Sequence, residues 1–155
     1  LNAILSGYIP TDDNIIVHNP DDQIVGYDGS FPQDIIKGHI TGISKGMLAT
    51  VVVVEGISYP YTGMKINNSV IQDIKMYPII PIPTHIGVTI FSPDIKEYFK
   101  RFFTLTEKVD FEATLFPELS QDRLLYSVSI PSHYWIPVND PSSFKKLVEK
   151  LAKDK

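Results

Sequence analysis

The residue best placed to do chemistry in this sequence is Asp21, an aspartate that follows an apolar run. Asn14 to His18 is apolar and bounded by turn formers, a pattern that predicts a buried strand. Asp21 comes just after this strand, and ligand sites in α/β proteins lie beyond the carboxyl ends of strands. The alternative interpretation is that Asp21 and Asp22 only form a turn, and both interpretations stay open at this point.

Other familiar kinds of site have little support in the sequence. The four histidines have no metal-ligand spacing, and the serines of the 127–129 segment lack the glycines of a nucleophile elbow. The absence of cysteine excludes disulfides, thiolate zinc sites and cysteine nucleophiles, and it fits a cytoplasmic protein. A net charge of −4 gives no electrostatic case for binding nucleic acid or an anionic membrane.

Length and composition indicate one globular domain. The chain has 155 residues, of which 43% are hydrophobic and 21% are charged, so it can bury a core. Its longest apolar run, Leu48 to Val54, has the length of a strand and is far too short to span a membrane. No secretory signal peptide is recognisable. We therefore expect residues 1–155 to form a single domain.

Strand and helix patterns alternate along the chain. The Leu48 to Val54 run is apolar throughout, which is typical of a strand covered on both faces. Asn67-Asn68-Ser69 between two alternating runs predicts a hairpin. We expect an α/β fold with five main strands in one mostly parallel mixed sheet and helices on both faces. The predicted helices cover 1–9, 33–44, 92–103, 110–119 and 141–153, and the predicted strands cover 14–18, 48–54, 61–66, 70–75, 86–91 and 124–130.

The last fifty residues resemble the end of a known domain. They read Val109-Asp110-Phe111-Glu112-Ala113-Thr114-Leu115-Phe116-Pro117-Glu118-Leu119, then Leu124-Leu125-Tyr126-Ser127-Val128, then Tyr134-Trp135-Ile136-Pro137-Val138-Asn139-Asp140-Pro141-Ser142-Ser143-Phe144. Sugar-phosphate nucleotidyltransferases typically show a "DFEKDLFP" helix, an "LYGY" strand and a "YWIDIGTPEDY" turn into a helix, in the same order and spacing. The resemblance implies a Rossmann-like three-layer sandwich of the glycosyltransferase-A-like type.

The resemblance also implies a reaction and a set of site residues. The family joins a sugar 1-phosphate to a nucleoside triphosphate and releases pyrophosphate, with magnesium offsetting the charge of the phosphates. Its "NGD" motif, which supplies a metal ligand, corresponds to Asn19-Pro20-Asp21, so Asp21 is the expected magnesium ligand. Its sugar-contacting "NAG" corresponds to His85-Ile86-Gly87, which makes His85 and Gly87 the expected substrate contacts. A partly buried structural role for His85 is the alternative.

Several family motifs are altered or absent in this chain. The aspartate of "WID" is Pro137, and the glutamate and lysine of "EFxEKP" are Met76 and Tyr77. Strand alternation sends the nearby Lys75 to the opposite face. Nothing matches the "GxGTRLxPLT" loop that opens the family domain. We therefore expect a domain that is incomplete at its N-terminus and lacks the Gly-rich loop unit, either as a fragment or as a naturally short protein.

These departures lead to two functional hypotheses. The first is part of a sugar-phosphate nucleotidyltransferase that is inactive as this chain alone, with magnesium as its cofactor if it is active. The second is a pseudoenzyme: a regulatory or scaffolding subunit that keeps the fold and binds a nucleotide-sugar or sugar phosphate. Both hypotheses predict a cytoplasmic protein that associates with another protein chain, because open strand edges and apolar surface invite pairing.

Overall fold

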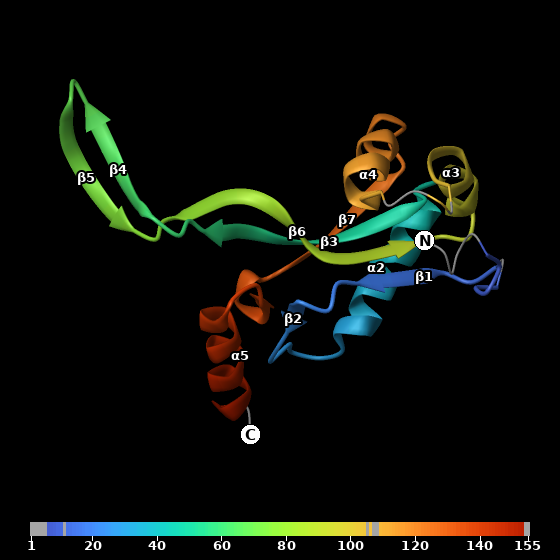
Figure 1. Cartoon of the computed structure of the whole chain (residues 1–155), viewed down its shortest axis with the longest axis horizontal. Coiled ribbons are helices and arrows are strands. Elements are labelled where there is room, and N and C mark those ends of the chain that lie inside the picture. The colour runs from blue at the N-terminus through green and yellow to red at the C-terminus, as the bar shows by residue number, and fades with distance from the viewer. Residues whose placement is uncertain (1–5, 11, 105, 107–108, 154–155) are drawn as a thin grey trace.

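The centre of the molecule is a four-stranded mixed sheet. The structure is a computed structural model that describes residues 6–10, 12–104, 106 and 109–153. The strand order is β1-β6-β3-β7, where β6 runs antiparallel to both of its neighbours and β7 runs parallel to β3 (Figure 1). Strands β1, β3 and β7 therefore share one direction. The bounds are Ile15–His18 for β1, Ala49–Ser58 for β3, Ile79–Phe91 for β6 and Leu125–Ile130 for β7.

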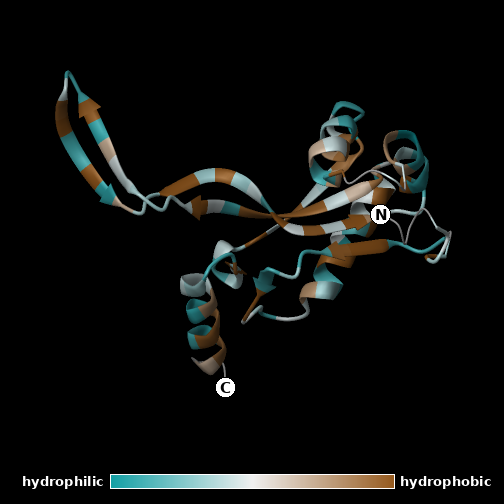
Figure 2. Cartoon of the chain, in the orientation of Figure 1, coloured by the Kyte–Doolittle hydropathy of each residue, from teal (hydrophilic) through white to brown (hydrophobic). Residues whose placement is uncertain are grey.

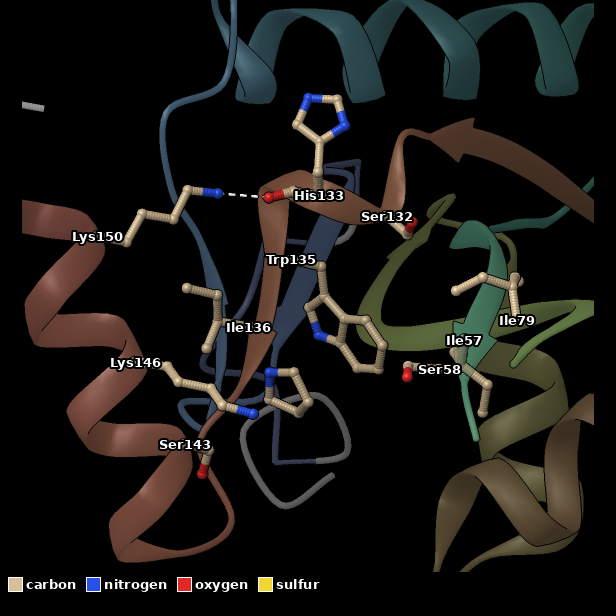
Figure 3. Close-up of a pocket in the computed structure, with 12 residues that line it drawn as sticks. Ile57, Ser58, Ile79, Ser132, His133, Trp135, Ile136, Ser143, Lys146 and Lys150 are labelled. Carbon is tan, nitrogen blue, oxygen red and sulfur yellow. Dashed lines mark hydrogen bonds between the residues drawn. The ribbon is translucent and has the colours of Figure 1, made fainter. Parts of the chain in front are cut away.

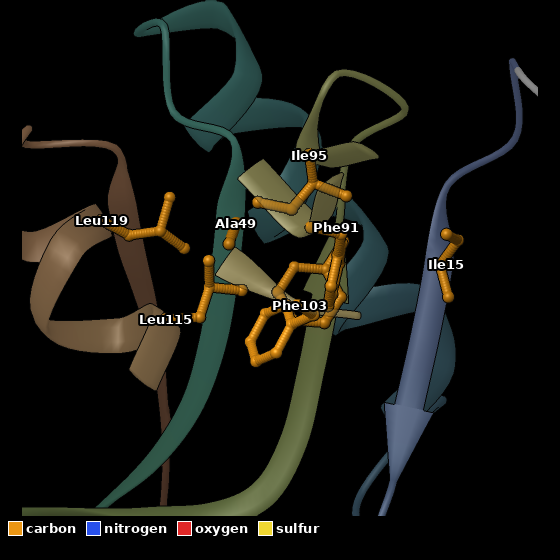
Figure 4. Close-up of a cluster of buried hydrophobic side chains, with 8 residues drawn as sticks. Ile15, Ala49, Phe91, Ile95, Phe103, Leu115 and Leu119 are labelled. Carbon is orange, nitrogen blue, oxygen red and sulfur yellow. The ribbon is translucent and has the colours of Figure 1, made fainter. Parts of the chain in front are cut away.

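Helices cover both faces of this sheet. On one face lies α2 (Phe31–Ser44), and on the other lie α3 (Ile95–Phe102) and α4 (Phe111–Gln121). A Cβ atom at Gly38 of α2 would lie 2.2 Å from a methyl group of Val128, so glycine lets the helix pack closely on β7. Figure 4 shows Leu115 and Leu119 of α4 beside Ala49 of β3. The predicted three-layer α/β fold is confirmed.

Strand β3 is apolar on both faces, as its sequence predicted. Ala49 belongs to the cluster under α3 and α4, whereas Val52 and Val54 belong to the cluster under α2. All three residues are fully buried. A strand that contributes to two cores has no polar face, which explains the unbroken apolar run.

The prediction of five strands in one sheet was wrong by one strand. The predicted hairpin is present, but its strands β4 (Thr62–Asn67) and β5 (Val70–Met76) pair only with each other. Asn68 and Ser69 form its two-residue turn, both with positive φ, which is the backbone geometry that this type of turn requires. The hairpin stands at the end of a long extension of β3 and β6 that projects from the body (Figure 1). We call β4 and β5 together the arm.

Strand β6 begins earlier than its sequence predicted. Only Ile86 to Phe91 was expected to be strand, because Pro81 and Pro83 disfavour a ladder. Strand β1 pairs only with the last four residues of β6, so the earlier residues have one open edge. A proline on an open edge forfeits no ladder hydrogen bond.

The remaining elements fall mostly where they were expected. Helix α5 (Pro141–Lys153) is confirmed, whereas α3 begins at Ile95, three residues after the predicted Ser92. The helix predicted over 1–9 lies largely outside the described residues, and residues 6–9 form turns and bends. Within the described part of the chain, no helix is long and apolar enough to cross a membrane.

Candidate functional site

A short antiparallel ribbon of β2 (Asp22–Ile24) and β8 (Trp135–Pro137) brings the two motif regions together. Asp22 lies directly opposite Pro137 in the register. Its carboxylate is buried, and its Oδ1 accepts a 2.7 Å hydrogen bond from the indole Nε1 of Trp135. Val138 N–H donates to the carbonyl of Asp21 at 2.8 Å, which closes the ribbon. The segments that correspond to "NGD" and "WID" therefore meet in space.

Gly87 makes the space for this carboxylate. It has a φ of +65°, and a Cβ atom there would lie 2.1 Å from Oδ2 of Asp22 and 2.7 Å from Nδ2 of Asn19. Asn19 N–H also donates to the Gly87 carbonyl at 2.8 Å. The end of β1, the start of β2 and the middle of β6 thus converge on one point. Any side chain at position 87 would displace Asp22 or Asn19.

The indole ring of Trp135 lines a cavity of about 580 Å³ (Figure 3). The cavity lies between the outer ends of β3 and β6 and the segment formed by η1 (Ser132–Tyr134), β8 and α5. We call it the Trp135 pocket. It is lined by Gly56, Ile57, Ser58, Ile79, Ser132, His133, Trp135, Ile136, Pro137, Ser143, Lys146 and Lys150.

Two lysines on α5 give the Trp135 pocket its charge. Lys146 and Lys150 are four residues apart, so they lie on the same face of the helix. Lys150 Nζ donates to the carbonyl of His133, which ties α5 to η1. No carboxylate lines this pocket among the residues that the structure describes. The pocket therefore suits an anionic ligand.

The N-terminus of α5 is fixed by a reciprocal pair of hydrogen bonds. Ser143 N–H donates to Oδ1 of Asp140 at 2.8 Å, and Asp140 N–H donates to Oγ of Ser143 at 3.1 Å. The backbone hydrogen bond from Ser143 lowers the pKa of the Asp140 carboxyl. Asp140 therefore caps α5, and it holds Ser143 at the rim of the pocket.

The combination of groups in the Trp135 pocket matches a phosphorylated sugar. An indole face and isoleucine side chains provide an apolar surface for a sugar ring. Lysine ammonium groups bind phosphate as point charges, and serine hydroxyls can donate to sugar oxygens. The size of the cavity is within the usual range for small-molecule sites.

The structure separates the predicted site residues. Asp21 is exposed, and it is Asp22, the next residue, that is buried against Gly87 and Trp135. His85 turns toward α4, where its Nδ1 lies 3.3 Å from Oε2 of Glu112 and its ring meets Phe116 edge-on. Neither Asp21 nor His85 lines the Trp135 pocket. These contacts favour the structural interpretation of His85, whereas substrate contact by His85 or Gly87 stays a prediction.

The residues that the structure describes contain no cluster of metal-ligating side chains. No group of three His, Cys, Asp or Glu side chains converges within them. Asp22 is committed to Trp135, and Pro137 opposite it has no side-chain donor atom. The assignment of Asp21 as a magnesium ligand stays a prediction.

The residues at the altered "EFxEKP" positions lie at the end of the arm and just beyond it. Met76 is the last residue of β5, and Tyr77 follows it with a φ of 50°. Their exposed fractions are 62% and 59%, and neither lines the Trp135 pocket.

Four residues of this site were missed by reasoning from the sequence: Asp22, Trp135, Lys146 and Lys150. A signal existed for two of them, because Trp135 is the single tryptophan of the chain and lies inside the "YWIP" segment, and Asp22 belongs to an acidic pair that follows a strand. The two lysines look like an ordinary solvated helix face in sequence.

Comparisons with known proteins give a likeness in fold. No protein-family model matches this chain, and no curated protein matches its sequence. Solved structures do match. One is a candidate glucose-1-phosphate thymidylyltransferase from Bacillus anthracis, solved in complex with sucrose, with a TM-score of 0.63 and 14% identity over 99% of this chain. Another is HddC from Yersinia pseudotuberculosis, with a TM-score of 0.55 and 19% identity over 97% of this chain.

The match covers only part of each of these relatives. This chain spans 59% of the Bacillus anthracis protein and 61% of HddC. At such low identity the likeness shows the fold and leaves activity, substrate and partners to be argued from the site.

Proposed function

We propose that this chain binds a nucleotide-sugar or a sugar phosphate in the Trp135 pocket, as part of a domain of the sugar-phosphate nucleotidyltransferase type. The observation that carries this proposal is the double role of Trp135. Its indole N–H holds the buried carboxylate of Asp22, and its ring lines a cavity that contains Lys146 and Lys150. The fold shared with the candidate thymidylyltransferase supports the same ligand class.

We also propose that this chain alone does not catalyse nucleotidyl transfer. Pro137 stands opposite Asp22 where the family carries a carboxylate, and Met76 and Tyr77 are exposed on the arm. Loss of one positioned electrostatic contact commonly lowers turnover about 100-fold or more. The loss of several such contacts leaves a domain that binds its ligand without turnover. The same properties fit a regulatory or scaffolding subunit. They also fit one part of an enzyme whose active site is completed by another segment.

Binding is tested by isothermal titration calorimetry with glucose 1-phosphate and with thymidine diphosphate-glucose. We expect Lys146→Ala to weaken binding about tenfold, because the phosphate loses one charged partner. Lys145→Ala is the matched control. It removes one positive charge from the same helix, but Lys145 lies outside the pocket. Equal affinity for both variants, or absence of binding by the unaltered chain, would refute this ligand site.

Turnover is tested by pyrophosphate release from nucleoside triphosphates and sugar 1-phosphates with magnesium. We expect none from this chain. Turnover that disappears in Asp21→Asn but persists in Lys145→Ala would overturn the inactive interpretation and would support Asp21 as the metal ligand.

The cytoplasmic location stays a prediction, and it bears on neither experiment.

A further inference from the structure

One face of the arm is apolar and exposed. Met64 lies opposite Ile74 in the register and Ile66 lies opposite Ile71, and residues that lie opposite each other share a face. The register shift between Lys65 and Ile66 is what brings Ile71 to the same face as Ile74. We call this the apolar arm face: Met64, Ile66, Ile71, Ile74 and Met76, with exposed fractions of 49% to 62%.

The opposite face of the arm carries charge. Lys65 lies opposite Asp73, and Lys75 lies two residues further along β5 on the same side. The alternation between apolar and polar residues along both strands is visible in Figure 2. A two-stranded ribbon of this length is marginally stable in water without a covering layer or further strands. The arm therefore has the sequence of an element that is completed by a partner.

The outer edge of β5 offers a backbone N–H whose partner is a neighbouring side chain. The backbone N–H of Ile74 donates to Oδ1 of the neighbouring Asp73 at 2.9 Å. An N–H in a strand points to one side only, so this hydrogen bond places the Ile74 N–H on the side away from β4. The Asp73 carboxylate that accepts this hydrogen bond belongs to a side chain that can rotate away.

The charges of β5 are complementary to those of a second β5. When two copies pair antiparallel about a two-fold axis at Ile74, Asp73 of each copy lies opposite Lys75 of the other. A two-fold axis at Asp73 would oppose two aspartates, and one at Lys75 would oppose two lysines. On β4, an axis at Lys65 would also oppose two lysines. Charge therefore selects both the strand and its register.

We propose that two copies of this chain associate through the arm, by antiparallel pairing of their β5 strands about Ile74. The two hairpins then form one four-stranded sheet, and their apolar arm faces become continuous. The N–H of Ile74 donates to the carbonyl of Ile74 in the second copy. The carboxylate of Asp73 then forms an ion pair with Lys75 of the second copy. Because the arm projects from the body, the two bodies lie apart in this dimer (Figure 1).

The oligomeric state is measured by sedimentation velocity over a wide range of protein concentration. We expect a concentration-dependent dimer. Lys75→Asp opposes two aspartates in each half of the interface, and it raises the dissociation constant about tenfold or more. Within its own hairpin Lys75 faces Gly63, so this change leaves the cross-strand pair of Lys65 and Asp73 intact.

Reversal of all three charges is the sharpest variant. In Lys65→Glu/Asp73→Lys/Lys75→Asp every attraction within the hairpin and between the copies is kept with its sign exchanged, so the dimer returns. When this variant is mixed with the original chain, mixed dimers do not form, because positions 73 and 75 of the two copies then oppose like charges. Ile74→Pro removes the outward N–H together with the isoleucine side chain, and it abolishes the dimer while circular dichroism keeps the spectrum of the folded chain.

Val148→Glu is the control, because Val148 lies in a different exposed apolar surface, on α5. It should leave the dimer unchanged. A monomer at every concentration would overturn the proposal. A dimer that resists Lys75→Asp and Ile74→Pro but is lost in Val148→Glu would overturn it as well, and would assign association to α5.

Discussion

The two halves of strand β6 show how the same sequence chemistry leads to opposite environments. Ile86 is fully buried between helices, whereas Ile82, four residues earlier, is 62% exposed on the extension toward the arm. Both halves pair with β3, so the backbone ladder is shared. What differs is the covering layer: α2, α3 and α4 pack only on the half that lies in the body. A β-branched run therefore predicts a strand but does not predict what covers it.

The strongest test of this difference is one substitution made in both halves. Ile86→Ala should lower the free energy of unfolding by about 2–5 kcal/mol, because it opens a cavity in a packed core. Ile82→Ala should change it by less than about 0.5 kcal/mol in the monomer, because an exposed side chain leaves no cavity. Chemical denaturation at a concentration below dimer formation measures both values. Comparable costs would mean that the extension is covered in solution.

Two glycines sharpen the comparison between a packed and an open position. Gly87 and Gly46 both have positive φ, so alanine strains the backbone at either place by about 1–2 kcal/mol. At Gly46 a Cβ atom would meet nothing within 4 Å, whereas at Gly87 it would meet Asp22 and Asn19. Gly87→Ala should therefore cost more than Gly46→Ala and should also change the emission of Trp135. Equal costs and unchanged emission would contradict the packing described around Asp22.

The cap of α4 tests whether the covering layer stabilises the body independently of the arm. Oδ1 of Asp110 accepts hydrogen bonds from the N–H groups of Glu112 and Ala113 at 2.9 Å and 3.4 Å. Asp110→Ala should cost about 1 kcal/mol of folding stability, as losses of helix caps do. It should leave the dissociation constant of the dimer unchanged. A change in dimerisation without a change in stability would contradict this separation.

The smallest expected effect is a pH dependence that arises in the body. His39 of α2 is buried, with Nδ1 2.9 Å from Oγ1 of Thr50 and Nε2 3.1 Å from Oδ1 of Asn14. Burial lowers its pKa, so the unfolded chain binds this proton more readily than the folded chain. The part of the folding stability that depends on a neutral His39 is fully present above the unfolded-state pKa of about 6.5. It is lost as the pH falls toward the lower pKa of the folded state.

Thermal unfolding across this pH range measures the effect. His39→Gln should be less stable at neutral pH, but its stability should decline less on acidification. A parallel decline in both chains would mean that His39 is not the group responsible.

Local patterns predicted most elements of the fold because each carries its own signal. The helix that begins near Asp110, the helix that begins at Pro141, the hairpin turn within Asn67-Asn68-Ser69 and the apolar run of β3 all lie where the sequence placed them. The separation of the arm from the sheet could not be predicted, because an alternating strand has the same pattern in either place. The early start of β6 was missed because prolines argue against a ladder unless one edge is open.

The candidate site was harder to predict because it depends on contacts between distant residues. Asp21 and Asp22 are adjacent in sequence, and only the pairing of β2 with β8 distinguishes the buried carboxylate from the exposed one. Lys146 and Lys150 become part of a cavity only because η1 and β8 turn α5 toward the ends of β3 and β6. No spacing rule within α5 contains that information.

The central claim is that the Trp135 pocket binds a phosphorylated sugar, and fluorescence of Trp135 tests it most directly. This residue is the only tryptophan in the sequence, so the emission reports on the site alone. We expect titration with thymidine diphosphate-glucose to shift the emission in a saturable way, with the midpoint raised in Lys146→Ala and unchanged in Lys145→Ala. An emission spectrum that stays constant, while calorimetry detects the ligand binding elsewhere, would contradict the account.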